Sequence, residues 1–225
     1  MENYLRRGVN AARFRLGRRL DHHAVSRAHD VFYRSDAWIR AAWLGTQALK
    51  NPLDLWVYQE IMFEARPDLI VETGTYRGGT AHYLASVCDL LGVGEVVSID
   101  IEPMRDDYPE HPRITYLAGR SSTHPEVLAE VRARAEGRRV LVILDSDHSQ
   151  AHVEAELEMY APLVPVGCYL IVEDSNIGQI RKDLMPGPLQ AVETFLARTD
   201  EFEIDREREK FLITFNPNGF LRRIR

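Results

Sequence analysis

Several features are scarce or missing in this sequence of 225 residues. Its only two cysteines, Cys88 and Cys168, lie in apolar runs rather than in disulfide-like loops, so we expect buried free thiols in a reducing compartment. No run of 18 apolar residues is present, and the N-terminal stretch MENYLRRGVN lacks the apolar core of a signal peptide. These absences predict a soluble, cytoplasmic protein with no membrane partner.

Positive charge is also scarce, and it is unevenly distributed. The 28 Lys and Arg are outnumbered by 34 Asp and Glu, and the net charge of −6 gives no general case for binding nucleic acid. Residues 1–50 nevertheless contain ten basic and four acidic residues, a charge of +6 that leaves −12 for the remainder. This basic arm could contact an anionic partner, but a solvated helical face is the interpretation that we favour.

The chain changes character near residue 66. Residues 1–65 read as an N-terminal helical segment, and residues 66–225 alternate short apolar runs with helical patterns. Helices are predicted at 80–92, 124–136, 150–161 and 187–199. Strands are predicted at 69–74, 95–100, 114–119, 139–145, 167–174, 202–207 and 211–216, the last two as an antiparallel closing hairpin. This α/β pattern predicts a mainly parallel, seven-stranded sheet covered on both faces.

Acidic residues recur at the ends of the predicted strands. Glu72, Asp100, Asp145 and the pair Glu173–Asp174 all stand at or just beyond the carboxyl end of a strand. In a parallel sheet these ends share one edge, which is where ligands bind in such folds. Four acidic strand ends on one edge therefore predict a binding site.

The stretch VETGTYRGGT (71–80) reads as a strand, a glycine-rich turn and the start of a helix. Gly74, Gly78 and Gly79 would let a ligand approach the backbone, and the helix start offers free amides. The spacing matches neither the dinucleotide pattern G-x-G-x-x-G nor the phosphate loop. Glu72 would repel a phosphate and suits an amino-bearing ligand. A tight turn that binds nothing would look similar, so the stretch alone is a weak signal.

Asp100 ends the next predicted strand, where a carboxylate can accept hydrogen bonds from both hydroxyls of a ribose. Together with Glu72, this favours a nucleoside that carries a charged, amino-acid-like tail. S-adenosylmethionine fits that description. NAD fits less well, since its pyrophosphate would lie against Glu72, and a dehydrogenase is therefore disfavoured.

A third group of acids forms at two strand ends that we expect to be neighbours. Asp145 follows one strand, and Glu173 and Asp174 follow the other. Three converging carboxylates suit Mg²⁺ or a similar hard divalent ion, whereas a zinc site would call for a Cys or His partner. The alternative is that these are ordinary solvated strand ends.

Five stretches, in order and spanning roughly residues 43–223, resemble a known family. They are KNPLDLWVYQEIMFEARPDLIVETGTYRGGT (50–80), LDSDH (144–148), YAPLVPVGCYLIVEDSNIG (160–178), PGPLQAVETFL (186–196) and FNPNGFLRR (215–223). Together they resemble the rhamnosyl O-methyltransferase/cephalosporin hydroxylase family of class I S-adenosylmethionine-dependent methyltransferases. The resemblance implies a Rossmann-like class I methyltransferase fold, with the N-terminal helices as a cap over the acceptor or as an oligomer interface.

The resemblance also implies roles for individual residues. The cofactor would be bound by Glu72, Gly74, Tyr76 and Gly78 at its methionine end, Asp100 at its ribose, Ser121 near its adenine, and Asp145. Mg²⁺ would be held by Asp145, Glu173 and Asp174. In related sugar O-methyltransferases the second acid of an Asp-x-Asp pair acts as general base. Asp147 occupies that position here, and the adjacent His148 competes for the role.

These assignments lead to an expected function. We expect a homo-oligomeric, Mg²⁺-dependent O-methyltransferase that acts on a hydroxyl of a small natural product or its attached sugar, as in antibiotic biosynthesis. A metal-bound hydroxyl loses its proton more readily, and a nearby base can accept that proton. The alternative from another class is a non-catalytic, cofactor-binding helper of a partner enzyme in antibiotic hydroxylation or methoxylation. No 2-His-1-carboxylate arrangement is visible, which disfavours autonomous iron oxygenase chemistry.

Overall fold

The computed structural model describes residues 22–225, apart from the side chains of His22 and Gln179. It comprises two compact units, of which the second runs from Trp38 to Arg225 and contains the sheet. The described part of the first unit contains helix α2 (His22–Arg34). Six of the arginines that make up the predicted basic arm, and the N-terminal stretch without a signal-peptide core, lie outside the described residues.

The sheet of the second unit has seven strands in the order β5-β4-β3-β6-β7-β9-β8. Their bounds are β3 (Leu69–Thr73), β4 (Glu95–Asp100), β5 (Ile114–Ala118), β6 (Val140–Leu144), β7 (Tyr169–Val172), β8 (Phe202–Ile204) and β9 (Phe220–Arg223). All neighbours from β5 to β7 pair in parallel, and β9 is antiparallel to both β7 and β8. The expected mainly parallel sheet with an antiparallel closing hairpin is therefore confirmed.

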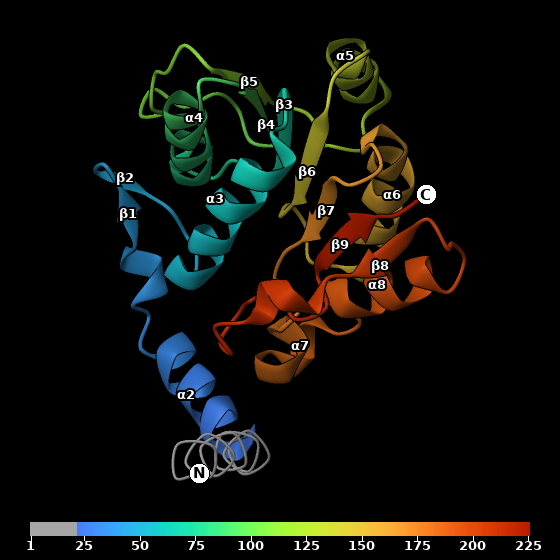
Figure 1. Ribbon diagram of the computed structural model, residues 1–225. Helices are drawn as coiled ribbons and strands as arrows, with labels where there is room; N and C mark the ends of the chain where they lie inside the picture. Colours follow the sequence, from blue (N-terminus) through green and yellow to red (C-terminus); the bar gives the residue numbers. More distant parts are fainter. Residues whose placement is uncertain (1–21) are drawn as a thin grey trace, which may run out of the picture. The chain divides into compact units, whose positions relative to one another are not determined.

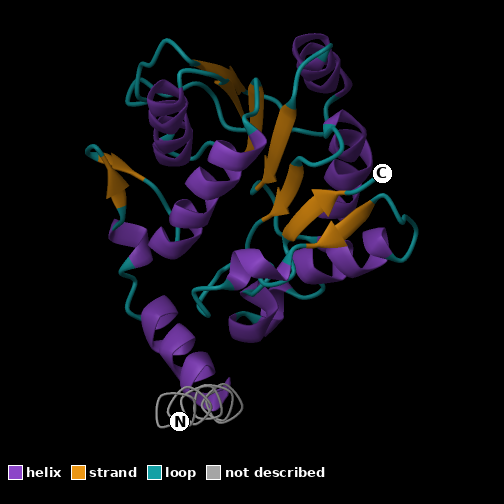
Figure 2. Ribbon diagram, in the orientation of Figure 1, coloured by secondary structure: helices purple, strands orange, loops and turns teal. Residues whose placement is uncertain are grey.

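Helices cover both faces of this sheet, as Figures 1 and 2 show. Helices α3 (Pro52–Ala65) and α4 (Gly79–Leu91) lie on one side, and α5 (Pro125–Ala135), α6 (Gln150–Tyr160) and α8 (Pro188–Leu196) lie on the other. A short helix, α7 (Ile177–Ile180), follows β7. Single 3-10 turns are found at Trp38–Arg40, Ala161–Leu163, Lys182–Leu184 and Arg206–Glu209. This three-layer arrangement leaves the carboxyl edge of the parallel strands open to a ligand.

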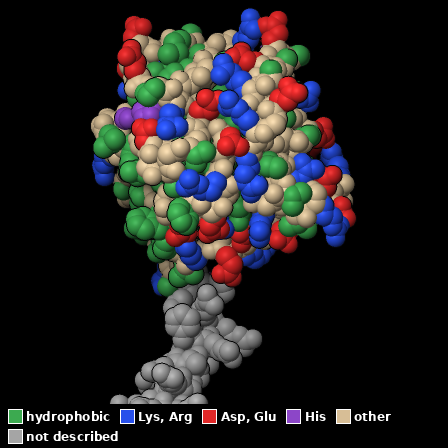
Figure 3. All heavy atoms as spheres, turned by 45° about the horizontal axis from the view of Figure 1, so that its top comes forward, with side chains coloured by type: hydrophobic (Ala, Val, Ile, Leu, Met, Phe, Trp, Pro, Cys, Tyr) green, Lys and Arg blue, Asp and Glu red, His purple; other side chains and the backbone are tan. Residues whose placement is uncertain are grey.

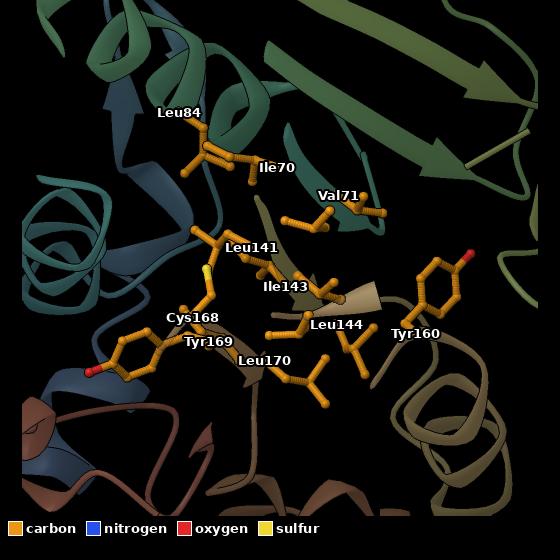
Figure 4. Packing of buried hydrophobic residues seen from close by; sticks show 14 of the residues in the cluster. Ile70, Val71, Leu84, Leu141, Ile143, Leu144, Tyr160, Cys168, Tyr169 and Leu170 are labelled. Atoms are coloured by element: carbon orange, nitrogen blue, oxygen red, sulfur yellow. The ribbon is translucent and has the colours of Figure 1, made fainter. Parts of the chain in front are cut away.

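The core lies along the two central strands, β3 and β6, in which every residue is buried. Val71, Ile143 and Leu170 come from three adjacent strands and pack among other apolar side chains (Figure 4). Because helices cover both faces, these strands carry continuous apolar runs rather than an alternating pattern. This is why they were recognisable in the sequence.

Two local predictions were wrong. The second strand of the closing hairpin is Phe220–Arg223, not 211–216, which instead forms a loop against the start of α3. In that loop the amide of Phe215 donates to the Asp54 carboxylate (2.9 Å), a bond that takes the place of strand pairing. Within the predicted N-terminal helices there is a small hairpin of β1 (Ala42–Trp43) and β2 (Thr46–Gln47). Leu44 and Gly45 join these strands, and both have positive φ, as a tight hairpin turn requires.

The boundary of the sheet-bearing unit also differs from the one expected near residue 66. Helix α3 belongs to this unit, because its buried side chains, among them Tyr58, Ile61 and Met62, are part of the main core. The capping or oligomerisation role assigned to residues 1–65 stays a prediction. Among residues 22–225, no helix has the length and apolar character needed to span a bilayer.

Candidate functional site

The turn between β3 and α4 brings the backbone of two strands into close contact. Gly74 has φ of +88°, and a Cβ atom there would lie 1.9 Å from the carbonyl oxygen of Asp145. Gly78 caps the N-terminus of α4, also with positive φ, at +75°. Only residues without a side chain fit these backbone positions easily. Of the two glycines expected to line the cofactor, Gly74 thus lies against Asp145, and Gly78 lies against Pro109 and Tyr116.

Asp100 is held in a fixed orientation at the end of β4. Its Oδ2 atom accepts a hydrogen bond from the amide of Tyr76 (2.8 Å), and its Oδ1 atom accepts one from the amide of Glu102 (2.9 Å). Tyr76 adopts a positive φ of 51°, which turns its amide toward Asp100 while its side chain stays exposed. A carboxylate oriented in this way keeps lone pairs free for the two hydroxyls of a ribose.

Glu72 lies beneath the same turn and is almost completely buried. Its Oε2 atom accepts a hydrogen bond from Ser98 Oγ (2.5 Å), and Thr75 Oγ1 lies 2.7 Å from that Ser98 oxygen. The other carboxylate oxygen, Oε1, is buried and has no hydrogen-bond partner among the described residues. Burial raises the pKa of Glu72 to about 7. An unsatisfied buried acceptor of this kind calls for a donor, and a cationic amino group would supply one.

Ser121 lies in the turn after β5, where its hydroxyl is 2.9 Å from that of Thr123. Its neighbour Ser122 points inward and donates to Oε1 of the buried Glu156 (2.5 Å), which also accepts a bond from Ser146 (2.8 Å). Glu156 therefore ties the turn after β5 to the loop after β6. These two loops flank the region in which an adenine was expected.

The acidic strand ends of β6 and β7 converge, together with a lysine that the sequence analysis did not single out. Lys50, just before α3, forms ion pairs with Asp145 Oδ2 and with Glu173 Oε2, the latter at 2.6 Å. Burial alone would lower the pKa of Lys50, but the two carboxylates raise it well above its ordinary value. Burial and the nearby Asp145 raise the pKa of Glu173 well above its usual range.

Asp174 and His148 complete the exposed side of this cluster. The Nε2 atom of His148 lies 3.2 Å from Asp174 Oδ2 and 3.4 Å from Asp145 Oδ1. Burial by itself would lower the pKa of His148, yet hydrogen bonds to the two acids raise it to about 10. One ligand atom from each of Asp145, His148 and Asp174 lies within 4.8 Å of the others.

This cluster can accommodate a divalent cation. Oε1 of Glu173 is buried without a hydrogen-bond partner among the described residues, and it belongs to the same group of acids as Asp145 and Asp174. An orphaned carboxylate oxygen beside two further carboxylates is a donor set that Mg²⁺ prefers. His148 stands where it could either ligate the ion or remain beside it.

Asp147 is oriented differently from its neighbours. Its Oδ1 atom accepts a hydrogen bond from the amide of Ser149 (2.7 Å), the residue that caps α6, and Ser149 lowers the pKa of Asp147. Asp147 is exposed, whereas the imidazole of His148 faces the acids. Of the two candidates for the general base, His148 is therefore the one that reaches the acid cluster.

A pocket of about 630 Å³ adjoins these residues. One wall is formed by Asp147 and His148 of the loop after β6 and by Gln150 at the start of α6, and the segment 183–186 forms the other. Leu184 and Met185 give the second wall an apolar surface, and both are partly exposed. The pocket thus combines apolar and polar walls next to the candidate catalytic residues.

A second layer of side chains supports the acids from α3 and the loop before β9. Asn216 accepts a hydrogen bond from the amide of Asp174 (3.1 Å) through its Oδ1 atom, and its Nδ2 atom donates to Tyr58 Oη (2.8 Å). Asp174 has a positive φ of 52°, a conformation that Asn216 helps to hold. These supporting residues come from segments more than 40 positions away from the acids, and no local pattern marked them.

Comparison with known proteins adds the family. Residues 35–224 match the family described as Rhamnosyl O-methyltransferase/CmcI. The chain belongs to this family. The Rhamnosyl O-methyltransferase of Mycobacterium tuberculosis (strain ATCC 25618 / H37Rv) is 36% identical over 201 residues, which cover 86% of this chain and 82% of the relative. The protein of that name from Mycobacterium leprae (strain TN) is 35% identical over 203 residues, covering 86% and 87%.

Solved structures of CmcI share the fold. The structure of CmcI-N160 in its apo form superimposes with a TM-score of 0.65 at 24% identity, covering 82% of this chain and 76% of the other. The structure of cmcI-D160 with Mg and SAM gives 0.62 at 21%, covering 82% and 77%. Family membership confirms the expected class of enzyme, an S-adenosylmethionine-dependent O-methyltransferase, and the structures confirm the class I methyltransferase fold.

Proposed function

We propose that this protein transfers the methyl group of S-adenosylmethionine, with the help of Mg²⁺, to a hydroxyl of a sugar attached to a small natural product. One observation carries the proposal: the cluster of Asp145, His148 and Asp174 lines an acceptor-sized pocket through His148. The same cluster adjoins the turn after β3, next to the strand ends that carry Glu72 and Asp100. The names of the mycobacterial relatives, and the Mg and SAM bound in a CmcI structure of the same fold, support this combination.

The cofactor would bind at the carboxyl edge of β3 and β4. Its ammonium group would meet the unsatisfied Oε1 atom of Glu72, and its ribose hydroxyls would bond to the carboxylate of Asp100. Gly74 and Gly78 would let the methionine end approach the backbone beside Tyr76. Ser121 would lie near the adenine. This order follows from the positions of the residues along the edge of the sheet.

Asp145, Glu173 and Asp174 would hold the cation. When bound there, Mg²⁺ would lower the pKa of a coordinated acceptor hydroxyl and help to orient it. A cation held by these acids would repel a proton on His148 and lower its pKa, so that the neutral imidazole would accept the proton of the acceptor hydroxyl at Nε2, the atom that faces the same acids. Asp147 would fix the start of α6 through its hydrogen bond with the Ser149 amide, and so hold the loop that carries His148 in place.

The pocket favours an acceptor with one polar and one apolar part. Gln150 and the acids could bind sugar hydroxyls, while Leu184 and Met185 offer an apolar wall to the aglycone. Figure 3 shows basic and acidic side chains interspersed over the described residues of the face in view, which offers no one-signed surface there for a nucleic acid. A role in antibiotic biosynthesis and assembly into a homo-oligomer remain part of the proposal.

Separate calorimetric titrations of S-adenosylmethionine and Mg²⁺ into the wild type and Asp174→Ala test the proposal. We expect the wild type to bind both, and the variant to lose Mg²⁺ while it retains the cofactor. Methyl transfer to rhamnosides with an apolar aglycone would then be measured by mass spectrometry, in buffer with Mg²⁺ and in EDTA. Cofactor binding by a wild type that has no affinity for divalent ions would contradict the metal-dependent mechanism. Light scattering tests the homo-oligomer.

A further inference from the structure

We propose that Lys50 is a positioning residue for the divalent-cation site. Its ammonium group binds one oxygen of Asp145 and one oxygen of Glu173, which leaves the second oxygen of each acid for the cation. The inference rests on the proposed function, since it assigns a supporting role within that site. Lys50 itself would contact neither the cofactor nor the acceptor.

Lys50 binds only one of the two oxygen atoms of each carboxylate. Lys50 takes Oδ2 of Asp145, while Oδ1 of the same residue faces His148. Lys50 likewise takes Oε2 of Glu173, while Oε1 is buried without a hydrogen-bond partner among the described residues. Each acid therefore has one oxygen bound by Lys50 and a second one that a cation could take, which is unpartnered in Glu173 and lies beside His148 in Asp145.

Lys50 also offsets part of the negative charge of the acids. Three carboxylates carry −3 in a site where Glu173 and Lys50 are each only 3% exposed. Buried acids at close range repel one another, and burial without a partner is costly. The ammonium group of Lys50 offsets one of these negative charges, and a divalent cation would offset the other two. Lys50 thus lets the acids stand close together before a cation arrives.

The backbone on both sides of Lys50 is held by hydrogen bonds. The amide of Lys50 donates to the carbonyl of Ala48 (2.8 Å), and the next residue, Asn51, caps α3 by accepting from the amide of Leu53 (3.1 Å). Asn51 Nδ2 also donates to the carbonyl of Ile213 (3.1 Å). Figure 1 shows the start of α3 at the end of the sheet where β6 and β7 terminate. A lysine anchored on both sides can hold two carboxylates in place.

A set of variants separates this role from a general contribution to stability. Lys50→Met removes the charge but keeps an unbranched chain, and Lys50→Arg retains the charge. Lys210→Met is the matched control, since the more exposed Lys210 pairs with Glu60 and not with the acids of the site. Mg²⁺ and S-adenosylmethionine are titrated separately into each protein by calorimetry, and methyl transfer is measured against Mg²⁺ concentration.

We expect Lys50→Met to weaken Mg²⁺ binding about tenfold or more, as the loss of supporting partners does at other metal sites. Its affinity for S-adenosylmethionine should stay within about twofold of the wild type, and excess Mg²⁺ should restore its methyl transfer. Lys50→Arg should recover part of the Mg²⁺ affinity, and Lys210→Met should match the wild type. A merely structural lysine would not produce this metal-specific, Mg²⁺-reversible effect.

Mg²⁺ binding by Lys50→Met that equals or exceeds that of the wild type would overturn the inference while the proposed function stands. A wild type that binds no Mg²⁺ would instead overturn the proposed function, and the role of Lys50 with it. If Lys50→Met fails to fold, Lys50→Arg decides the question. Its altered head group should weaken Mg²⁺ binding, and unchanged Mg²⁺ affinity would count against a positioning role.

Discussion

His148 Nε2 lies 3.2 Å from the Oδ2 atom of Asp174, although the two residues follow different strands. The contact places an imidazole against the acids that we assign to Mg²⁺. The positions of these two residues in the sequence did not predict this contact. The relationship favours His148 over Asp147 as the group that accepts the acceptor's proton.

We therefore expect His148→Asn to lower kcat by about 10²- to 10⁴-fold, the usual range for the loss of a general base. Asp147→Asn should lower kcat by less than about tenfold, since the Asp147 carboxylate serves the Ser149 amide. The measurement is kcat at saturating cofactor and Mg²⁺. A larger loss in Asp147→Asn than in His148→Asn would assign the base to Asp147. Loss of Mg²⁺ binding in His148→Asn would instead identify a metal ligand.

Glu72 provides a prediction about pH. Burial raises its pKa to about 7, and an ammonium-bearing cofactor favours the ionised carboxylate. The affinity for S-adenosylmethionine should therefore rise by roughly tenfold between pH 5.5 and pH 7, because the ionised fraction of Glu72 rises over that range. Titration calorimetry at the two pH values measures this change. Glu72→Gln should bind weakly with little pH dependence, whereas Glu136→Gln, at an exposed site, should match the wild type.

Gly74 gives a prediction about stability. The methyl group of an alanine at this position would collide with the backbone of Asp145, and the alanine would also have to adopt a positive φ. Gly74→Ala should lower the free energy of unfolding by at least about 2 kcal/mol. Gly92→Ala is the control, because Gly92 has a φ of +69° but no atom lies within 4 Å of an added Cβ. This variant should lose only about 1 kcal/mol of unfolding free energy. Urea denaturation measures the two free energies of unfolding. If both variants lose the same amount, backbone strain and not the contact with Asp145 explains the loss in Gly74→Ala.

Asp54 makes stability depend on pH. Burial raises its pKa from 3.8 to about 7, so the folded protein retains a proton that the unfolded chain releases at lower pH. The free energy of unfolding should fall as pH rises from about 4 to about 7, by up to about 4 kcal/mol from this group. Asp54→Asn keeps an acceptor for the Phe215 amide and should remove this part of the slope.

The control for this measurement is Asp200→Asn, which changes a carboxylate whose side chain is 81% exposed. Its unfolding free energy should follow the wild-type pH dependence. Urea denaturation at several pH values compares the three proteins. An unchanged slope in Asp54→Asn would mean that other groups produce the pH dependence.

Much of the sheet was predictable because its signals are local. Strands β3 and β6 are buried on both faces, so their apolar runs stand out in a chain of mixed polarity. Asp100 ends β4 and Asp145 directly follows β6, and the parallel pairing of β3 with both strands brings these ends to one edge. The prediction of a strand at 211–216 was wrong because these residues form a loop, which Asp54, about 160 positions earlier in the chain, holds through a hydrogen bond to Phe215.

The amino-acid sequence by itself determined the class of fold, the edge of the sheet at which acids gather and the family to which the chain belongs. It could do so because apolar runs, glycine turns and strand ends are each recognisable within a few consecutive residues. Only the tertiary structure decided which acid oxygens remain free, which way His148 and Asp147 turn, and that Lys50 joins Asp145 across 95 positions of chain. Those facts depend on contacts between segments that fold together, and no local pattern encodes them.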